Sequence, residues 1–156
     1  MTQLGIGGVI KSYFYKPLYR VVFWYRVVCY LKQTKYLRHS IAPFAYFILQ
    51  HLGYKYGVFL NTNIYVGSGL YIEQGGCIYL NAEHIGKNFS VFHEVTLDIT
   101  PGKGKSWVED NVTIYMGAKV IGDVKLMSGC VVGANAVVTK DVQEGRIVVG
   151  IPAKEI

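Results

Sequence analysis

Three ionisable residues between positions 73 and 98 have the chemistry needed to take a proton from a hydroxyl group. The imidazole of His93 exchanges a proton near neutral pH, and Glu73 and Asp98 supply carboxylates. A carboxylate that binds one imidazole nitrogen fixes the tautomer and leaves the other nitrogen to act as a general base. These residue types make His93 a candidate general base, with Glu73 or Asp98 as the candidate to orient it. The alternative is that His93 only faces solvent.

The other histidines and the cysteines suggest no further reactive site. His84 precedes the apolar Ile85, so we expect it to face outward, and His39 and His51 fall in or beside predicted helices, where structural roles are expected. Metal sites need ligands at characteristic spacings, and no pair of histidines has such a spacing. The cysteines lack a CxxC pair, so we predict no metal and reduced thiols, as in a cytosolic protein. They are Cys29, Cys77 and Cys130.

A repeat with a period of six must position these residues. This period fits neither the 3.6 of a helix nor the 2 of an open strand. It is typical of a solenoid whose coils contain three short strands, closed by turns rich in Gly and Asn. We predict a mainly β fold of this kind. The large positions are Val108, Ile114, Val120, Leu126, Val132 and Val138, and the small ones are Val112, Ala118, Val124, Cys130, Ala136 and Val142.

The spacing of the repeat also predicts where coils are interrupted. His93 follows Gln74 by nineteen residues, close to one coil of three hexads, so it should stack about 4.8 Å from the Gln74 corner. The step from Ile72 to Leu80 is eight residues, which predicts a bulge at residues 73–77. The pattern stops again after Leu97, so we expect a loop at 98–107, a position where functional residues tend to gather.

The chain before the repeat is expected to form a helical cap over residues 1–56, followed by the solenoid at 57–156. Pro17 suits the first turn of an amphipathic helix over residues 18–32, which is too short and too polar for a membrane span. A second helix is predicted from Pro43 to about Leu52, ended by Gly53. The Gly-rich residues 1–10 are expected to be frayed or extended.

The positive charge is concentrated in this first part of the chain. The net charge is +6, yet residues 1–72 carry +8 because eight Lys and Arg occur there without an Asp or Glu. Aromatic and basic residues at helical spacing suit either a cap that closes the first coil or contact with an anionic membrane surface. No nucleic-acid-binding module is present. The start of the chain lacks the features of a signal sequence, so we expect a cytoplasmic protein, with peripheral contact at the inner face of the membrane as the alternative.

Several motifs resemble a known family. The run IGDVKLMSGCVVGANAVVTKDV, followed by VVGIPAK, is similar to the C-terminal half of hexapeptide acyltransferases, which form a left-handed parallel β-helix. The segments GLYIEQGGCIYLN and IGKNFSVFHEVTL resemble the serine acetyltransferase branch, which includes polysaccharide-biosynthesis acetyltransferases. The resemblance implies a homotrimer, acetyl-CoA as donor, active sites in clefts between subunits, and a histidine as general base on the acceptor hydroxyl.

The chain departs from this family at the catalytic segment. Gln74 stands where the family has its catalytic histidine, and Phe59 aligns with the carboxylate that orients it. Glutamine has no titratable nitrogen, so it cannot act as the base. The family commonly has Gln at the position of His93, so the two residue types look exchanged between neighbouring coils. This exchange is why we assign the base to His93.

The resemblance also assigns cofactor-binding residues. Met116, Gly117 and Ala134 match positions whose backbone lines the pantetheine arm, where small side chains permit close approach. Lys140 and Lys154 match basic positions near the adenine and phosphates, and Lys103 and Lys105 lie among loop glycines suited to an anion. Trp107 is expected to cover the prism rather than to stack on a ligand.

Together these features predict an acetyl-CoA-dependent O-acetyltransferase that acts on a hydroxyl of a sugar or a similar small acceptor. The short helical segment and the altered active-site segments make serine the less favoured acceptor. A second hypothesis is a catalytically inactive trimeric β-helix that serves as a scaffold or binding protein. A third is transfer of a longer acyl chain.

Overall fold

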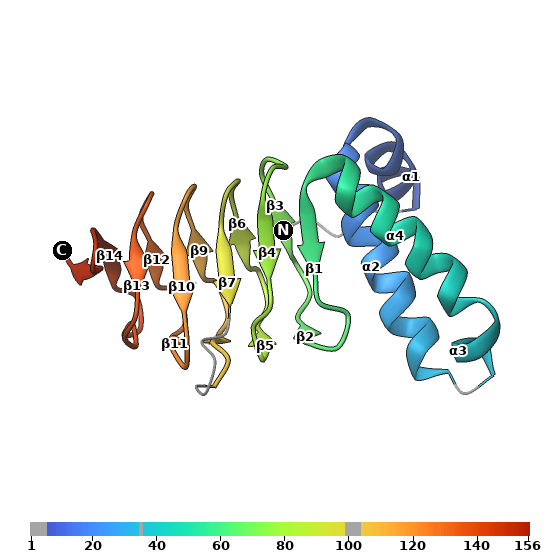
Figure 1. The fold of residues 1–156 in the computed structure, drawn as a ribbon. Coiled ribbons are helices and arrows are strands. Elements are labelled where there is room, and N and C mark those ends of the chain that lie inside the picture. Colours follow the sequence, from blue (N-terminus) through green and yellow to red (C-terminus); the bar gives the residue numbers. More distant parts are fainter. Residues whose placement is uncertain (1–5, 35, 99–103) are drawn as a thin grey trace.

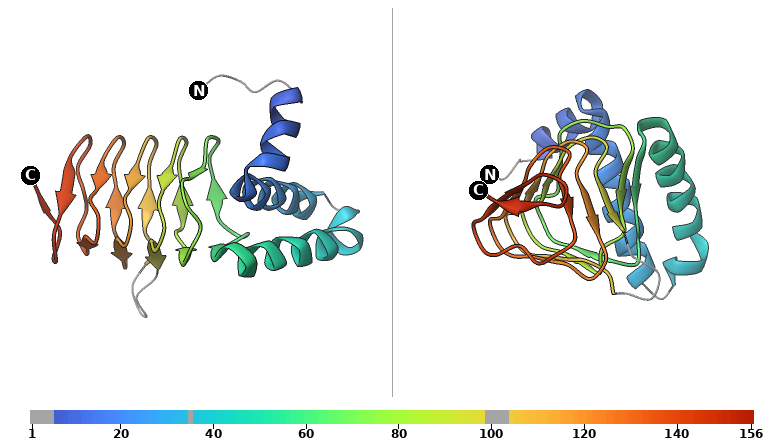
Figure 2. Two further views of the ribbon diagram at one scale, coloured as in Figure 1. Left: turned by 90° about the horizontal axis from the view of Figure 1, so that it is seen from above. Right: turned by 60° about the vertical axis from the view of Figure 1, so that its left-hand side comes forward.

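The computed structural model describes residues 6–34, 36–98 and 104–156. Helices come first along the chain, and short strands follow, wound into a three-sided prism (Figure 1). The helices are α1 (Ile6–Tyr15), α2 (Pro17–Gln33), α3 (Leu37–Ser40) and α4 (Ala42–Tyr56). They lie together at one end of the prism, and the C-terminus lies at the other end (Figure 2).

The described strands form three sheets along the sides of the prism, with parallel pairing except between β14 and β15. The first sheet has β1 (Val58–Leu60), β4 (Ile78–Leu80), β7 (Thr96–Asp98), β10 (Lys119–Ile121) and β13 (Val137–Val138). The second has β11 (Lys125–Leu126), β8 (Trp107–Val108), β5 (His84–Ile85) and β2 (Tyr65–Val66). The third has β15 (Lys154–Glu155), β14 (Ile147–Val149), β12 (Val131–Val132), β9 (Thr113–Ile114), β6 (Ser90–Val91) and β3 (Tyr71–Ile72).

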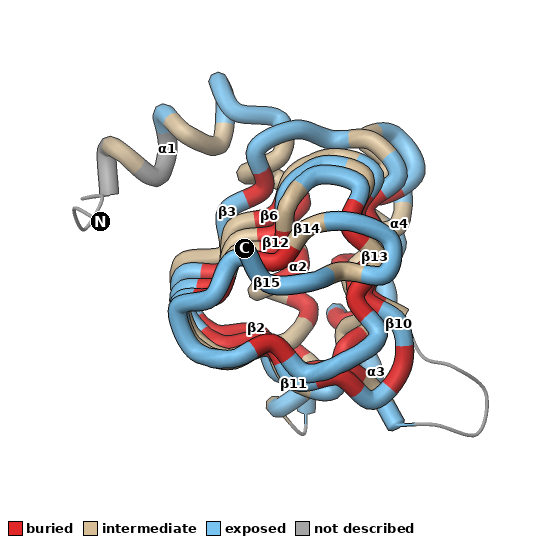
Figure 3. Tube along the Cα trace, turned by 90° about the vertical axis from the view of Figure 1, so that its left-hand side faces the viewer, coloured by how far each residue is buried: buried red, intermediate tan, exposed pale blue. Residues whose placement is uncertain are grey.

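The predicted left-handed parallel β-helix is confirmed, and its interior is the six-residue repeat. Every large and small position of the repeat from Val108 to Val142 is at most 2% exposed. Seen along the axis, the buried segments of successive coils lie over one another (Figure 3). Burial raises the pKa of the Cys130 thiol to about 11, so this inward cysteine stays protonated and unreactive near neutral pH.

The pairing register shows where coils contain extra residues. Ile72 pairs with Val91 and Tyr79 pairs with Thr96, so the corner between these pairs has two more residues in the earlier coil. This confirms the bulge after Ile72. Another long coil lies between His84 and Trp107, which pair although they are 23 residues apart. Its extra residues fall between β7 and β8, where 99–103 lie outside the described residues.

Two expectations about the helices were wrong, and tertiary contacts explain both. Residues 6–10 belong to α1 rather than to a frayed start, and the guanidinium of Arg20 in α2 donates to the carbonyl oxygens of Tyr13 and Phe14 at the end of α1. The second long helix continues through Gly53 to Tyr56. Gly57, at φ +65°, provides the left-handed cap instead.

The helices close the open end of the solenoid mainly through α2. Tyr25 is fully buried, and its hydroxyl donates to the carbonyl oxygen of Ile64 at 3.1 Å. The Arg26 guanidinium donates to the carbonyl oxygens of Val66 and Gly67. These contacts bind the cap to the edge strand of the first coil. No helix in the described part of the chain has the length and apolar character to cross a membrane.

The close contact of α4 with the first strand generates a stability prediction. A Cβ at Gly53 would lie 2.9 Å from the carbonyl oxygen of Val58, so Gly53→Ala must displace backbone. We expect it to lower the free energy of unfolding by about 1 kcal/mol, because overpacking of about 2 kcal/mol exceeds the roughly 1 kcal/mol by which alanine favours a helix.

Urea unfolding followed by circular dichroism measures this change. His51→Ala is the matched control, since His51 is exposed on the same helix and its substitution introduces no clash. Equal stability of Gly53→Ala and the unaltered chain would contradict the packing explanation.

Candidate functional site

Residues assigned to the site gather at one corner of successive coils, between the third and first sheets. His93, Met116 and Ala134 each lie two residues after paired positions of β6, β9 and β12. Backbone bonds continue this register, because the amide of Gly117 donates to the carbonyl of His93 at 3.0 Å and that of Asn135 donates to Met116 at 2.9 Å. The residue predicted to be the base therefore lies on the same corner as residues predicted to bind the donor.

Gly76, rather than Gln74, lies directly next to His93 on the preceding coil. The amide of Glu94 donates to the carbonyl of Gly76 at 2.8 Å, and a Cβ at Gly76 would lie 4.0 Å from the Cβ of His93. Gln74 lies two residues earlier, exposed in the bulge. The expected stacking of His93 on Gln74 thus needs correction. The two extra residues of the bulge shift the register at this corner.

The ring of His93 has one nitrogen with an unusual environment. His93 is partly buried, and its Nδ1 atom is buried without a hydrogen-bond partner among the described residues. Leaving a buried polar atom unpaired costs about 1–3 kcal/mol, so such atoms are rare and often have a role in function.

The two predicted carboxylates have other partners within the single chain. A hydrogen bond with Glu73 raises the pKa of the Tyr71 hydroxyl. Asp98 accepts a hydrogen bond from Nδ2 of Asn81 at 3.3 Å, and Asn81 in turn accepts one from Asn61 at 2.8 Å. Because Nδ1 of His93 has no hydrogen-bond partner among the described residues, neither carboxylate bonds to it in this structure.

Backbone strain adjoins the histidine. Glu94 has φ +59°, a left-handed conformation, while Gly117 and Asn135 occupy the same corner on later coils. This conformation costs a residue such as Glu about 1–2 kcal/mol, whereas Gly and Asn tolerate it. Strain of this kind clusters at functional sites. The ammonium group of Lys119 donates to the carbonyl oxygen of Glu94 across the corner and holds this conformation.

The residues assigned to the donor separate into two groups. Met116 and Ala134 are exposed beside His93, and Gly117 lies under Asn135, whose Oδ1 would be 2.0 Å from an added Cβ. Lys140 and Lys154 are exposed, the former two residues after β13 and the latter at the start of β15. Lys103 lies outside the described residues, while Lys105 is partly buried.

One feature of the second sheet was not expected. His84 faces outward as predicted, but its ring is stacked between Tyr65, with centroids 4.9 Å apart, and Trp107, at 4.2 Å. These residues pair in register on β2, β5 and β8. The sequence carried a signal for this stack, since an aromatic residue directly precedes the inward-facing residue in each of these three strands. Among the described residues, no group of three or more His, Cys, Asp or Glu is placed to hold a metal ion.

The strain at Glu94 leads to a prediction about stability. Glu94→Gly should raise the free energy of unfolding by about 1 kcal/mol, because glycine adopts a positive φ without a steric penalty. Glu83→Gly is the control: Glu83 is another exposed glutamate, without positive φ, and its replacement should lower stability by about 0.5–1 kcal/mol. Thermal unfolding of both variants gives the comparison. A loss of stability in Glu94→Gly would show that its backbone is not strained.

Comparison with known proteins finds similar sequences and folds. Residues 105–140 match the model of the bacterial transferase hexapeptide family (six repeats). Serine acetyltransferase of Mycobacterium tuberculosis is 34% identical over 104 residues, which are 64% of this chain and 45% of that protein. The chain thus spans about half the length of the curated relatives that it matches.

Solved structures share the fold over nearly the whole chain. Serine acetyltransferase from Brucella abortus strain S19 superposes with a TM-score of 0.77 and 25% identity, covering 91% of this chain and 57% of that one. A serine acetyltransferase in complex with CoA gives a TM-score of 0.78 over 93% of this chain and 60% of that one, with 22% identity. The chain thus contains the hexapeptide repeat of bacterial transferases at residues 105–140, and it is similar in sequence and fold to serine acetyltransferases.

Proposed function

We propose that this protein is an acetyl-CoA-dependent O-acetyltransferase that acts on the hydroxyl of a small acceptor, as a homotrimer in the cytoplasm. Nε2 of His93 takes the proton of the acceptor hydroxyl, and the oxygen attacks the thioester carbonyl. When the tetrahedral intermediate collapses, the carbon–sulfur bond breaks, and the imidazolium returns the proton to the sulfur of CoA. Acetyl ester and free CoA are the products.

The observation that carries this proposal is the position of His93 on one corner with Met116 and Ala134, with Nδ1 buried and without a hydrogen-bond partner in the described part of the chain. A general base needs its second nitrogen bound, so that the tautomer is fixed. We assign this task to Glu73, which is exposed in the adjoining bulge and can exchange its surface hydrogen bond with Tyr71 for one with Nδ1. Asp98 is less suited because it belongs to the Asn61–Asn81 network.

Acetyl-CoA is proposed as the donor because of the relatives and because of the residues at the His93 corner. The relatives are acetyltransferases, and one fold neighbour was solved with CoA. In this chain Met116, Gly117 and Ala134 would lie along the pantetheine arm, and Lys103, Lys140 and Lys154 would attract its phosphates. The small side chain of the exposed Ala134 and the absence of one at Gly117 leave room for an extended thioester along this corner.

We propose a sugar hydroxyl as the acceptor, with serine as the second candidate. The departure at Gln74 is the reason to expect an acceptor other than serine, because this segment differs from the family pattern. Serine is supported by the names of the relatives. The two acceptors are distinguished directly by assay.

A second candidate function is an inactive trimeric scaffold. The observation in its favour is that Gln74 replaces the expected histidine, while no carboxylate of the described residues bonds to Nδ1 of His93. Such a protein would release no CoA from acetyl-CoA with any acceptor, whether or not it binds CoA.

The role of His93 is tested by substitution. His93→Ala should lower kcat/KM by about 10²-fold or more, the usual contribution of a general base. The assay measures free thiol released from acetyl-CoA with simple sugars, nucleotide sugars and serine. His84→Ala, on the outer face of the second sheet, should retain activity. Undiminished turnover in His93→Ala would assign the base elsewhere, and no turnover in the unaltered protein would favour the scaffold.

The role of Glu73 is tested separately. Glu73→Gln keeps the shape of the side chain but removes the charge that stabilises the imidazolium, so we expect kcat to fall by about 10–100-fold. Asp98→Asn is the matched control and should lose less than about threefold. Steady-state kinetics at saturating acetyl-CoA measures both. A larger loss in Asp98→Asn than in Glu73→Gln would reverse the assignment.

A further inference from the structure

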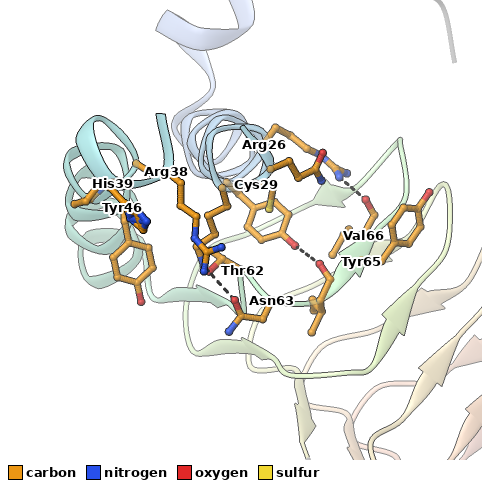
Figure 4. Close-up of a pocket in the computed structure, with 15 residues that line it drawn as sticks. Arg26, Cys29, Arg38, His39, Tyr46, Thr62, Asn63, Tyr65 and Val66 are labelled. Atoms are coloured by element: carbon orange, nitrogen blue, oxygen red, sulfur yellow. Dashed lines mark hydrogen bonds between the residues drawn. The ribbon is translucent and has the colours of Figure 1, made fainter. Parts of the chain in front are cut away.

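A cavity lies where the helical cap meets the first coil (Figure 4), and His93 is not among the residues that line it. Its volume is about 810 Å³, within the range of small-molecule sites. It is bordered by α2 and by the segment from α3 to the start of α4 on one side, and by residues 62–66 on the other. The cavity is far larger than a simple ion requires, so it has room for an organic ligand.

The lining of this cavity is cationic. Arg26 and Lys32 contribute from α2, and Arg38 and His39 from α3. None of the described residues that line it is acidic. The sequence itself contains no Asp or Glu before Glu73. A concave site lined by charges of one sign raises the local concentration of the opposite ion.

Neutral groups accept the hydrogen bonds that two of these cations donate. The Lys32 ammonium donates to Oγ1 of Thr62 at 2.5 Å and to Oδ1 of Asn63 at 3.1 Å. Arg26 donates to the carbonyl oxygens of Val66 and Gly67. These bonds hold the side chains in place but leave their positive charge uncompensated. The side chains of Lys32 and Arg26 are therefore already positioned for an anion, and Arg38 adds a second guanidinium to the lining.

Aromatic rings complete the lining. Tyr25, Tyr46 and Tyr65 border the cavity, and the Lys32 ammonium lies 5.8 Å from the centroid of the Tyr46 ring. Tyr65 is 59% exposed and is the first ring of the stack that continues through His84 to Trp107. Exposed aromatic faces beside cations suit a ligand with both a ring and an anionic group.

The cavity and the His93 corner lie on different edges of the prism. Thr62 and Asn63 are in the turn from β1 to β2, which joins the first sheet to the second. His93 is in the turn from β6 to β7, which joins the third sheet to the first. A ligand in the cavity is therefore not the thioester at His93 of the same chain.

We propose that this cavity is a binding site for a phosphate ester, with the phosphates between Lys32 and Arg38 and the ring of the ligand against Tyr46 or Tyr65. Arginine and lysine bind phosphate oxygens through charge-assisted hydrogen bonds, which are about twice as strong as neutral ones. Arg26 holds the cap on the first coil and adds to the positive field. The ligand is either a soluble sugar or nucleoside phosphate, or the headgroup of a phosphate-bearing lipid.

Calorimetric titration of the full chain with pyrophosphate and with uridine diphosphate tests the site. We expect dissociation constants below about 1 mM. The double variant Lys32→Gln/Arg38→Gln should weaken binding at least about tenfold. Lys11→Gln/Lys16→Gln removes the same charge from exposed positions outside the cavity and should bind as the unaltered chain does. Arg38→Gln alone, in the exposed α3, provides the test if the double variant does not fold.

Sedimentation with vesicles distinguishes the two sources of phosphate. A lipid headgroup is identified if the chain binds phosphatidylglycerol vesicles but not phosphatidylcholine vesicles, and if pyrophosphate displaces the chain from the phosphatidylglycerol vesicles. Pyrophosphate binding without vesicle binding identifies a soluble ester. Both results support the site.

Three results would overturn the proposal. They are no heat of binding at about 10 mM of either probe, equal weakening in the two double variants, or binding of both probes by Lys32→Gln/Arg38→Gln as tight as by the unaltered chain. The proposal does not depend on acetyl transfer, because binding is measured without turnover.

Discussion

The stacking of inward side chains at every sixth residue is the constraint on which the rest of this structure depends. Val120, for example, pairs with Leu97 on one side and with Val138 on the other, and all three are at most 2% exposed. Burying one such side chain contributes about 1.5–3 kcal/mol, so a shift that turned these positions outward would forfeit the core. Each coil must therefore return to register after its three sides. Extra residues are accommodated only at the corners, as in the bulge after Ile72 and between β7 and β8.

The corners consequently carry what is special about this chain. Most left-handed corner positions are Gly or Asn, such as Gly117, Asn88 and Asn111, and their side chains or amides bond from coil to coil. At the corner of His93 the pattern breaks in three ways. The preceding coil has two more residues at this corner, Glu94 is strained, and a buried imidazole nitrogen has no hydrogen-bond partner among the described residues. Each is unfavourable for stability alone. Their coincidence at one place, beside Met116 and Ala134, is the physical reason to regard this corner as the site.

The helical cap solves a different problem of the solenoid. The first coil has no preceding coil, so its apolar interior and the edge of β2 would be open to water. Tyr25 covers the interior, while Arg26 satisfies the carbonyl oxygens of Val66 and Gly67 at the edge. A consequence of using basic residues for this purpose is the cationic cavity between cap and coil. Basic residues of the cap thus both help to close the fold and give the cavity its attraction for anions.

The sequence by itself determined the fold, because a period of six is compatible with few backbones and because each inward position could be identified by residue type. It also determined the long helix after Pro17, the bulge after Ile72 and the outward direction of His84, since these follow from local chain geometry. The tertiary structure alone decided that Gly76 lies next to His93, that Gly53 stays within α4 and that α1 forms. Those outcomes depend on pairing between coils, on contact with Val58 and on the capping bonds of Arg20. Such contacts join residues far apart in the chain, and no local pattern encodes them.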